Sequence, residues 1–321
     1  MQVRFWGTRG SLPVAPQAST ITDKVTDALL AAGGRRFADR DEAEAFIRDE
    51  LPFAVGQGYG GATSCVEIDT GQGAFAVCDM GSGVREFGID SMRRAGADGR
   101  DLEWHFFMSH LHWDHIMGFP FFAPAFVEGA KIVIHSGHAD AEDALRRQQE
   151  EISFPVAFDW LKADITFRTL APGRNYAIGD LSVALIEQEH SHQSFGYRFT
   201  DKAGKNVVYS TDAEYKIANM DAEAAMVDFI AETDLMIADT MYSLADSVSM
   251  KEDWGHSSNI VAVDLCHRAR ARRLALFHHE PVYSDADIEQ MHAETIRYEE
   301  LTRSGNALEV LCSYDGLCVE L

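Results

Sequence analysis

The sequence His110-Leu111-His112-Trp113-Asp114-His115 constrains this chain more than any other feature, because it places three histidines and a carboxylate within six residues. It closely follows residues 104–108, whose apolar side chains predict a buried strand. Imidazole nitrogens and carboxylate oxygens are ligands for zinc, iron and manganese. A helical pair of histidine ligands would be four residues apart, whereas this spacing suits a tight loop between a strand and a helix. Because such groups are rarely buried without partners, the loop predicts a metal site.

The charge balance limits the partners of the chain. Its 321 residues include 51 acidic and 28 basic side chains, which give a formal net charge of −23. A surface this negative repels phosphate backbones and therefore disfavours bulk nucleic acid as a partner. A local positive site, such as one made by metal ions, still attracts a small anion.

The cysteines and the first residues bear on the compartment. Five cysteines are scattered without metal-finger spacing, which predicts free and mostly buried thiols in a reducing compartment. The start of the chain has no basic segment followed by an apolar one, and no apolar run approaches the ~18 residues of a membrane span. We therefore expect a cytoplasmic protein that does not enter a membrane.

The pattern of apolar residues predicts an α+β fold. Strands are expected at residues 2–6, 65–69, 74–79, 104–108, 131–135, 165–169, 181–188, 195–200, 206–210, 235–238, 274–277 and 308–312. Helices are expected at residues 84–95, from about 116, at 140–150 and at 259–270. Two β-rich halves, each carrying helices, favour a four-layer αββα sandwich with a site along one sheet edge.

One segment interrupts this pattern. Residues 19–51 are rich in Ala, Asp, Glu and Arg, and their apolar spacing indicates two amphipathic helices broken at Gly33-Gly34. We interpret the segment as a helical insertion at about residues 18–52 in a single domain that spans residues 1–321.

Further ligand-type residues follow other predicted strands. His190 and His192 come after the strand that ends at residue 188, Asp212 follows residues 206–210, and His278 follows residues 274–277. The repeated layout predicts that these residues join the first loop in a two-metal site. Asp79 and Asp239 also end apolar strands, and we expect their carboxylates to hold ligand histidines.

The motif and the order of these residues resemble the metallo-β-lactamase superfamily, whose signature HxHxDH stands here at residues 110–115. The match covers nearly the whole chain, with residues 14–55 as the main departure. The resemblance implies two divalent metal ions, with zinc favoured and manganese or iron as alternatives. One metal would bind His110, His112 and His190, and the other would bind Asp114, His115 and His278, with Asp212 bridging both. Asp212 and His278, with no cysteine at the bridging position, fit the hydrolase branches rather than the antibiotic-resistance enzymes.

One of these positions stays open. Where relatives often have His-Pro-Gly-Gly, this chain has His190-Ser191-His192-Gln193. The register favours His190 as the ligand, and His192 remains an alternate ligand or a group that supports one.

A finer resemblance is to the phosphodiesterase branch, which includes tRNA 3′-processing endonucleases, a cyclic-phosphate diesterase of phosphonate metabolism and bacterial cyclic-nucleotide diesterases. The matching segments are Phe5-Trp6-Gly7-Thr8-Arg9-Gly10-Ser11, Tyr59-Gly60-Gly61-Ala62-Thr63-Ser64-Cys65, Gly255-His256-Ser257-Ser258 and Phe277-His278-His279-Glu280-Pro281.

The expected chemistry assigns two catalytic residues. A hydroxide held between two metals would attack phosphorus, with Asp114 orienting it as well as binding metal. His256 is the candidate general acid, because imidazole titrates near working pH. The serines after it are also read as the cap of a following helix. The aromatic residues 119–122 and Phe126 are read as core or a dimer face, with a lid that stacks a nucleobase as the alternative.

These readings lead to a metal-dependent phosphodiesterase that acts on a small anionic substrate such as a cyclic nucleotide. The first alternative is a thioesterase or lactonase that uses the same metal site on a carbonyl group. The second is a non-catalytic metal-binding protein of the same fold. A homodimer is left open.

Overall fold

The computed structural model describes residues 1–71, 73–96, 99–100, 102–191, 193–215, 220–243 and 254–321. Within these residues the chain forms two sheets of seven strands each. The first sheet has the order β14 (Cys318–Glu320), β1 (Gln2–Gly7), β2 (Cys65–Asp69), β3 (Phe75–Cys78), β4 (Glu103–Met108), β5 (Lys131–Ser136) and β6 (Asp164–Thr169). The second has the order β13 (Glu309–Cys312), β12 (Arg273–Phe277), β11 (Leu235–Asp239), β10 (Asn206–Ser210), β9 (Ser194–Thr200), β8 (Leu181–Gln188) and β7 (Asn175–Ile178).

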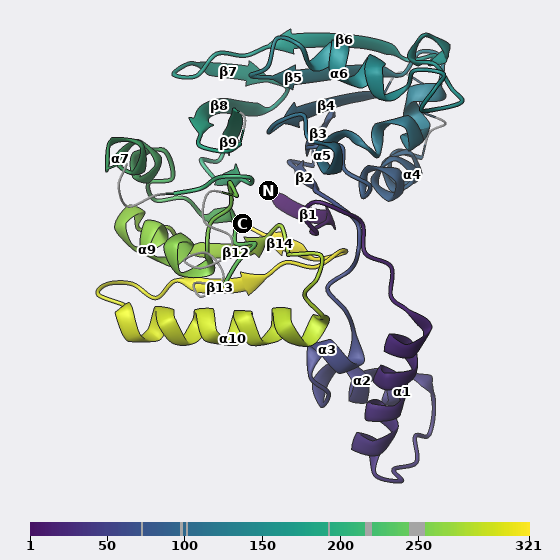
Figure 1. Cartoon of the computed structure of the whole chain (residues 1–321), viewed down its shortest axis with the longest axis vertical. Coiled ribbons are helices and arrows are strands. Elements are labelled where there is room, and N and C mark those ends of the chain that lie inside the picture. Colours follow the sequence, from purple (N-terminus) through teal and green to yellow (C-terminus); the bar gives the residue numbers. More distant parts are fainter. Residues whose placement is uncertain (72, 97–98, 101, 192, 216–219, 244–253) are drawn as a thin grey trace.

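Helices cover the outer faces of both sheets (Figure 1). On the first sheet they are α4 (Val84–Ala95), α5 (Trp113–Ile116) and α6 (Ala141–Gln148), with the short 3-10 helices η1 (Phe119–Phe121), η2 (Ala123–Phe126) and η3 (Phe158–Trp160). On the second they are α7 (Met220–Phe229), α9 (Asn259–Ala269) and α10 (Asp285–Thr302). The expected four-layer αββα sandwich is confirmed.

The layers arise because the side chains of each strand point alternately toward the other sheet and toward the helices. In β4, Phe107 packs between the two sheets, while Trp104 and Phe106 on its other face pack against the helices. Phe277 of β12 likewise joins the core between the sheets, and Leu276 faces the helices. Because successive side chains of a strand point to opposite faces, a strand covered on both faces is apolar throughout.

The direction of the strands brings several strand ends together. Strands β3 to β6 run parallel, and so do β10 to β13. The two sheets are joined at the carboxyl end of β4, where the Phe195 amide donates to the Ser109 carbonyl at 2.9 Å and the Tyr197 hydroxyl donates to the Met108 carbonyl at 2.8 Å. Residues that follow β3, β4, β10, β11 and β12 therefore lie at one edge of the sandwich.

The two helices expected on either side of Gly33-Gly34 are α1 (Ala18–Ala32) and α2 (Arg40–Asp49), followed by the short α3 (Phe53–Gly56). Gly33 ends α1 with a φ of 56°, a left-handed conformation that favours glycine. Figure 1 shows these three helices beside the sandwich rather than over either sheet. No residue of α1 is buried. That the segment is an insertion into a single domain stays a prediction.

Other expectations about the fold were incomplete. The helix expected from about residue 116 is wrong, because α5 ends at Ile116 and short 3-10 turns with Pro120 and Pro124 follow. A proline lacks the amide hydrogen that a continued helix requires. Strands β7 and β14 and helices α7 and α10 were not predicted. All five cysteines are free and four are buried. No helix in the described parts of the chain is long and apolar enough to cross a bilayer.

Candidate metal centre

Three polar residues directly follow strands in an uncommon backbone conformation. Asp79 follows β3, Asp212 lies just beyond β10 and His278 follows β12, with φ angles of 59°, 50° and 65°. The left-handed region costs a residue with a Cβ about 1–2 kcal/mol. Such outliers cluster at functional sites, where the turn directs a side chain. Here all three side chains are buried at the same edge of the sandwich.

The histidine loop meets them from β4. His110 lies just after the strand, His112 is the extended residue before α5, and Asp114 and His115 lie within that short helix. The helix therefore begins inside the motif, which turns its last two ligand-type residues inward. His110, Asp114 and His115 are buried.

The first group of side chains comprises His110, His112, His190 and Asp212, which offer ligand atoms within 4.8 Å of one another. His190 Nε2 lies 3.2 Å from His112 Nδ1. Asp212 Oδ1 lies 3.7 Å from Nε2 of both His110 and His190. These distances leave the donor atoms around a common point.

The second group comprises Asp114, His115 and His278. Asp114 Oδ2 lies 3.2 Å from Nε2 of both histidines, and the two Nε2 atoms are 3.3 Å apart. Asp212 also reaches this group, because its Oδ2 lies 3.1 Å from His115 Nε2 and 3.3 Å from His278 Nε2. One carboxylate thus faces both groups, with one oxygen toward each.

The protonation states suit a cation. Burial lowers the pKa of His110, His112 and His190, which favours neutral imidazoles, the form that binds metal ions. Burial alone would raise the pKa of Asp114 and Asp212, but His278 and the positive charge of His115 hold it far below the usual range. The carboxylates in turn raise the pKa of His115 well above that of a free imidazole. Two ionised carboxylates in a buried cluster require compensating positive charge, which a protonated His115 supplies in the absence of a metal ion and a bound cation would supply in its place. His110 Nε2, although buried, has no hydrogen-bond partner among the described residues. The cluster therefore fits a divalent metal site.

Two acceptors fix the rings of candidate ligands. Asp79 Oδ2 accepts from His115 Nδ1 at 2.8 Å, and the same carboxylate accepts from Ser109 and Tyr209. The Gly255 carbonyl accepts from His190 Nδ1 at 2.8 Å. Each bond leaves Nε2 of the histidine as the atom directed at the cluster, as is usual for metal-binding imidazoles.

Asp239 has a different partner from the one expected. It accepts from His256 Nδ1 at 2.7 Å, and these two residues form a third group of possible ligands with Asp212 and His278. His256 also stacks on His278, with ring centroids 5.1 Å apart. Burial opposes protonation of His256, but the Asp239 carboxylate outweighs it and raises the pKa of His256 to about 9.

The serines after His256 have structural contacts. Ser258 caps α9, because its side chain accepts from the Val261 amide. Ser257 donates to the Ala213 carbonyl at 2.6 Å and accepts from the Tyr215 amide at 3.1 Å. The loop with His256 is thereby tied to the loop with Asp212.

Some of the expected residues lie elsewhere. His192 lies outside the described residues. Phe119 and Phe122 are buried with the core beneath the helices of the first sheet, as the core reading predicted, while Phe121 is 56% exposed and Phe126 is 41% exposed.

A backbone contact was also missed. The Ser11 amide donates to Asp114 Oδ2 at 2.8 Å. The segment Phe5-Trp6-Gly7-Thr8-Arg9-Gly10-Ser11 carried a resemblance, but no side chain in it pointed to this role.

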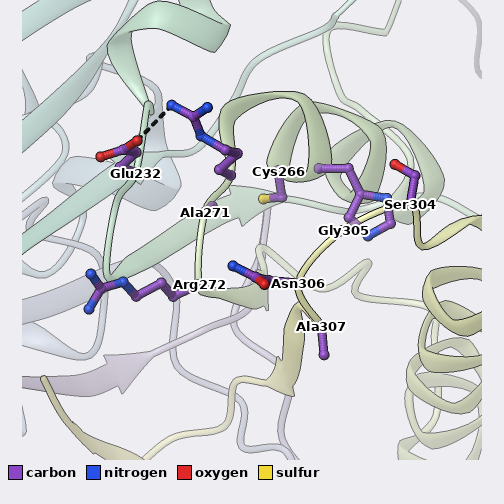
Figure 2. A pocket seen from close by; sticks show the side chains of 10 residues that line it. Glu232, Cys266, Ala271, Arg272, Ser304, Gly305, Asn306 and Ala307 are labelled. Carbon is purple, nitrogen blue, oxygen red and sulfur yellow. Dashed lines mark hydrogen bonds and ion pairs between the residues drawn. The ribbon is translucent and has the colours of Figure 1, made fainter.

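A cavity of about 610 Å³ lies at the opposite edge of the second sheet (Figure 2). Its walls come from the chain before β11, β12 and β13 and include Glu232, Arg270 and Arg272. Arg270 pairs with Glu232 at 2.6 Å, and Arg272 pairs with Asp234 at 3.0 Å. A strand of five residues separates this edge from the histidine cluster by roughly 16 Å at about 3.3 Å per residue. This cavity is therefore separate from the candidate metal centre.

Comparisons with known proteins agree with this geometry. The metallo-beta-lactamase fold protein YhfI from Bacillus subtilis is 17% identical with a TM-score of 0.64, covering 99% of this chain and 98% of that one. The short form of human tRNase Z is 18% identical with a TM-score of 0.61, covering 100% and 99%. Yeast PDE1 is 12% identical with a TM-score of 0.66, covering 100% and 99%. Identities this low show a shared fold and no more.

The sequence comparison is more specific. No curated protein matches the sequence. Residues 98–279, more than half of the chain, match the family described as the beta-lactamase superfamily domain. That segment contains the histidine loop, His190, Asp212 and His278. The chain therefore belongs to the beta-lactamase superfamily.

Proposed function

We propose that this protein is a binuclear metal-dependent phosphodiesterase that acts on a small substrate such as a cyclic nucleotide. The observation that carries the proposal is the position of Asp212, whose two oxygens face two separate groups of ligand-type side chains. One metal would be held by His110, His112 and His190, the other by Asp114, His115 and His278, and both by Asp212. Zinc fits these ligands best, with manganese or iron as alternatives. When bound, paired divalent ions supply an activated water and neutralise the charge of a phosphodiester.

The residues around the cluster have roles in this proposal. Asp114 Oδ2 accepts from the Ser11 amide and lies 3.2 Å from two imidazoles, so its orientation is fixed. From there it would orient the attacking water. His256 would hold a proton at Nε2, because its Nδ1 is bonded to Asp239. A general acid must be protonated at working pH, and the Asp239 carboxylate favours the protonated form of His256 by raising its pKa.

The reaction class rests on the acid beside the cluster and on the fold. Hydrolysis of an alkyl phosphodiester expels an alkoxide, which needs a proton. The proteins with the same fold over their whole length include the short form of human tRNase Z and yeast PDE1. The net charge of −23 disfavours a large polyanionic substrate and supports a small one.

The test uses the purified protein loaded with zinc or manganese. Substrates are bis-p-nitrophenyl phosphate, cyclic AMP, cyclic GMP, an acyl lactone and a glutathione thioester. We expect hydrolysis of the phosphodiesters. Turnover of the lactone or thioester with no activity on any phosphodiester would replace the proposal with the carbonyl hydrolase alternative.

The proposed acid is tested by the leaving group. We expect His256→Ala to lower kcat by about 100-fold for a cyclic nucleotide, whose leaving alkoxide needs a proton, within the usual range for loss of acid catalysis. The effect on bis-p-nitrophenyl phosphate should be much smaller, because p-nitrophenolate leaves as a stable anion. His292→Ala is the matched control, since His292 bonds the Val310 carbonyl outside the cluster. Equal losses on both substrates would show that His256 does not protonate the leaving group.

A further inference from the structure

A cavity of about 520 Å³ lies at the root of the helical segment, between the start of α1 and two loops of the sandwich. Its walls come from residues 14–24, from the loop at 57–61 and from the loop at 281–285. A volume of this size is within the range of small-molecule sites.

Two walls of this cavity start at the candidate metal centre. The Ser11 amide bonds Asp114, and Val14, three residues later, already lines the cavity. On the other side His278 belongs to the second ligand group, and Pro281 lines the cavity three residues later. Since a chain advances at most about 3.6 Å per residue, both walls start within roughly 11 Å of the centre. Because this distance is an upper bound, a substituent on a phosphorus atom at the centre extends toward the start of the cavity.

The charged residues in the walls are already engaged. Lys24 Nζ bonds the Ala54 and Gln57 carbonyls at 2.5 Å and the Asp285 carboxylate at 2.6 Å, which uses all three of its protons. Arg9 donates to the carbonyls of residues 60, 280 and 283 and pairs with Asp285. These cations hold the loops in place, so the cavity is poorly suited to a second phosphate.

The uncharged part of the wall is mixed, with polar side chains at Gln17, Thr20, Gln57 and Ser284 and apolar residues that are partly exposed. Val14, Pro16, Ile21 and Val282 line the cavity, and Ile21 is 49% and Val282 77% exposed to solvent. Covering such surface with an apolar ligand group is favourable. The lining therefore favours an uncharged group over a charged one, and its apolar part fits an aromatic ring.

We propose that this cavity binds an aromatic group on the substituent that stays bonded to the phosphorus of the substrate. This proposal rests on the proposed phosphodiesterase function. His256, which would protonate the leaving oxygen, adjoins His190 and bonds Asp239, whereas the cavity begins beside Ser11 and Asp114. His256 also stacks on His278, three residues before the cavity wall at Pro281, so the proposed acid and the cavity entrance lie on neighbouring sides of the centre. The helical segment would then determine which phosphodiesters bind well.

The test compares two anions that share a phosphinate group and have no ester bond to cleave. Diphenylphosphinate carries aromatic groups and dimethylphosphinate does not. Isothermal titration of the metal-loaded protein should show tighter binding of diphenylphosphinate. We expect Ile21→Asp to weaken that binding by at least about 10-fold, as for loss of an apolar pocket contact, and to leave dimethylphosphinate nearly unchanged. Leu29→Asp is the matched control, because Leu29 lies on the same helix, is 69% exposed and is not part of the cavity.

Kinetics provide the second measurement. For phenyl p-nitrophenyl phosphate, Ile21→Asp should raise KM with little change in kcat, while methyl p-nitrophenyl phosphate should be unaffected. Equal binding of the two phosphinates by the unmodified protein, no binding of either, or equal effects of the two substitutions would overturn the inference. If neither ester is hydrolysed but the phosphinate preferences hold, the proposed function fails and the cavity assignment stands.

Discussion

Asp79→Asn is the sharpest perturbation of the candidate centre, because asparagine keeps the size of aspartate and also tolerates the left-handed backbone that this position adopts. The carboxylate accepts four hydrogen bonds of 2.7–2.8 Å, from the Ser109 amide and hydroxyl, the Tyr209 hydroxyl and His115 Nδ1. An amide replaces one acceptor oxygen with a donor. In either orientation of the asparagine amide, its NH2 group faces at least one of these four donors and cannot accept a hydrogen bond from it.

The structure gives two separate magnitudes. A buried donor left without an acceptor costs about 1–3 kcal/mol, so the free energy of unfolding of the metal-free protein should fall by that amount. His115 also loses the charge that orients its ring and increases its basicity. Loss of such a partner lowers metal affinity by about 10–100-fold, which corresponds to about 1.4–2.7 kcal/mol.

The two effects are measured independently. Urea denaturation in the presence of a chelator gives the stability of the metal-free protein, and competition with a chromophoric chelator gives the metal affinity. Asp234→Asn is the control, because this buried carboxylate accepts from the Asn206 amide at 3.0 Å and lies at the opposite edge of the sheet. It should lose stability and keep metal affinity. If Asp79→Asn behaves like this control, Asp79 supports only the fold and the argument about His115 is refuted.

Three further predictions follow from other contacts. Gly255→Ala should weaken metal binding by about 10-fold or more, because Gly255 has a φ of +86° and an added Cβ would lie 2.4 Å from His190 Nδ1; unchanged affinity in the chelator competition would exclude this. The hydrogen bond from Arg303 lowers the pKa of Glu299 to about 2, below its value in an unfolded chain, so this pair stabilises the fold above about pH 4.5 and its contribution is lost as pH falls toward 2. The stability deficit of Glu299→Gln should therefore shrink over that range in urea denaturation, and a constant deficit would contradict it. Zinc at about 100 times its dissociation constant should stabilise the protein by about 2.7 kcal/mol for each site filled, and a Tm insensitive to zinc would count against a resident metal.

Much of the candidate centre follows from a simple regularity of sheets. Asp212 comes two residues after an apolar run that was predicted as a strand, and His278 comes directly after another; these runs are β10 and β12. Since the parallel strands of a sheet end at one edge, ligand-type residues after such runs are expected to meet. Asp212 and His278 meet each other and the loop with His110 and His115, although that loop is about a hundred residues or more away from them in sequence.

The helix α10 shows where the periodicity fails. Its buried stripe consists of Ile288, Met291, Thr295 and Glu299, of which two are polar. The search for apolar residues at helical spacing therefore misses it. A capping box at Ser284 was a readable signal, because a serine followed three residues later by an acidic side chain typically begins a helix. The pairing of β14 with β1 joins distant parts of the chain and leaves no comparable local signal.

The partners of the outer carboxylates could not be predicted. Asp79 and Asp239 both end strands at the site, yet one holds His115 and the other holds His256. Which imidazole a carboxylate meets depends on how the loops of both sheets fold over the edge. The contact between Ser257 and the loop with Asp212 sets this arrangement and joins residues more than forty positions apart.

The left-handed residues give the strongest reason to regard the cluster as functional. If the turns after β3, β10 and β12 only had to reverse the chain, glycine would serve at about 1–2 kcal/mol less strain per position. Instead Asp212 and His278 carry side chains that join the cluster, and Asp79 holds the His115 ring from outside it. The ring of His278 fits only because Gly10 opposite lacks a Cβ, which would lie 2.5 Å from it. The need for an imidazole at that point outweighs the preference of the backbone, and metal binding is the chemistry that the neighbouring groups support.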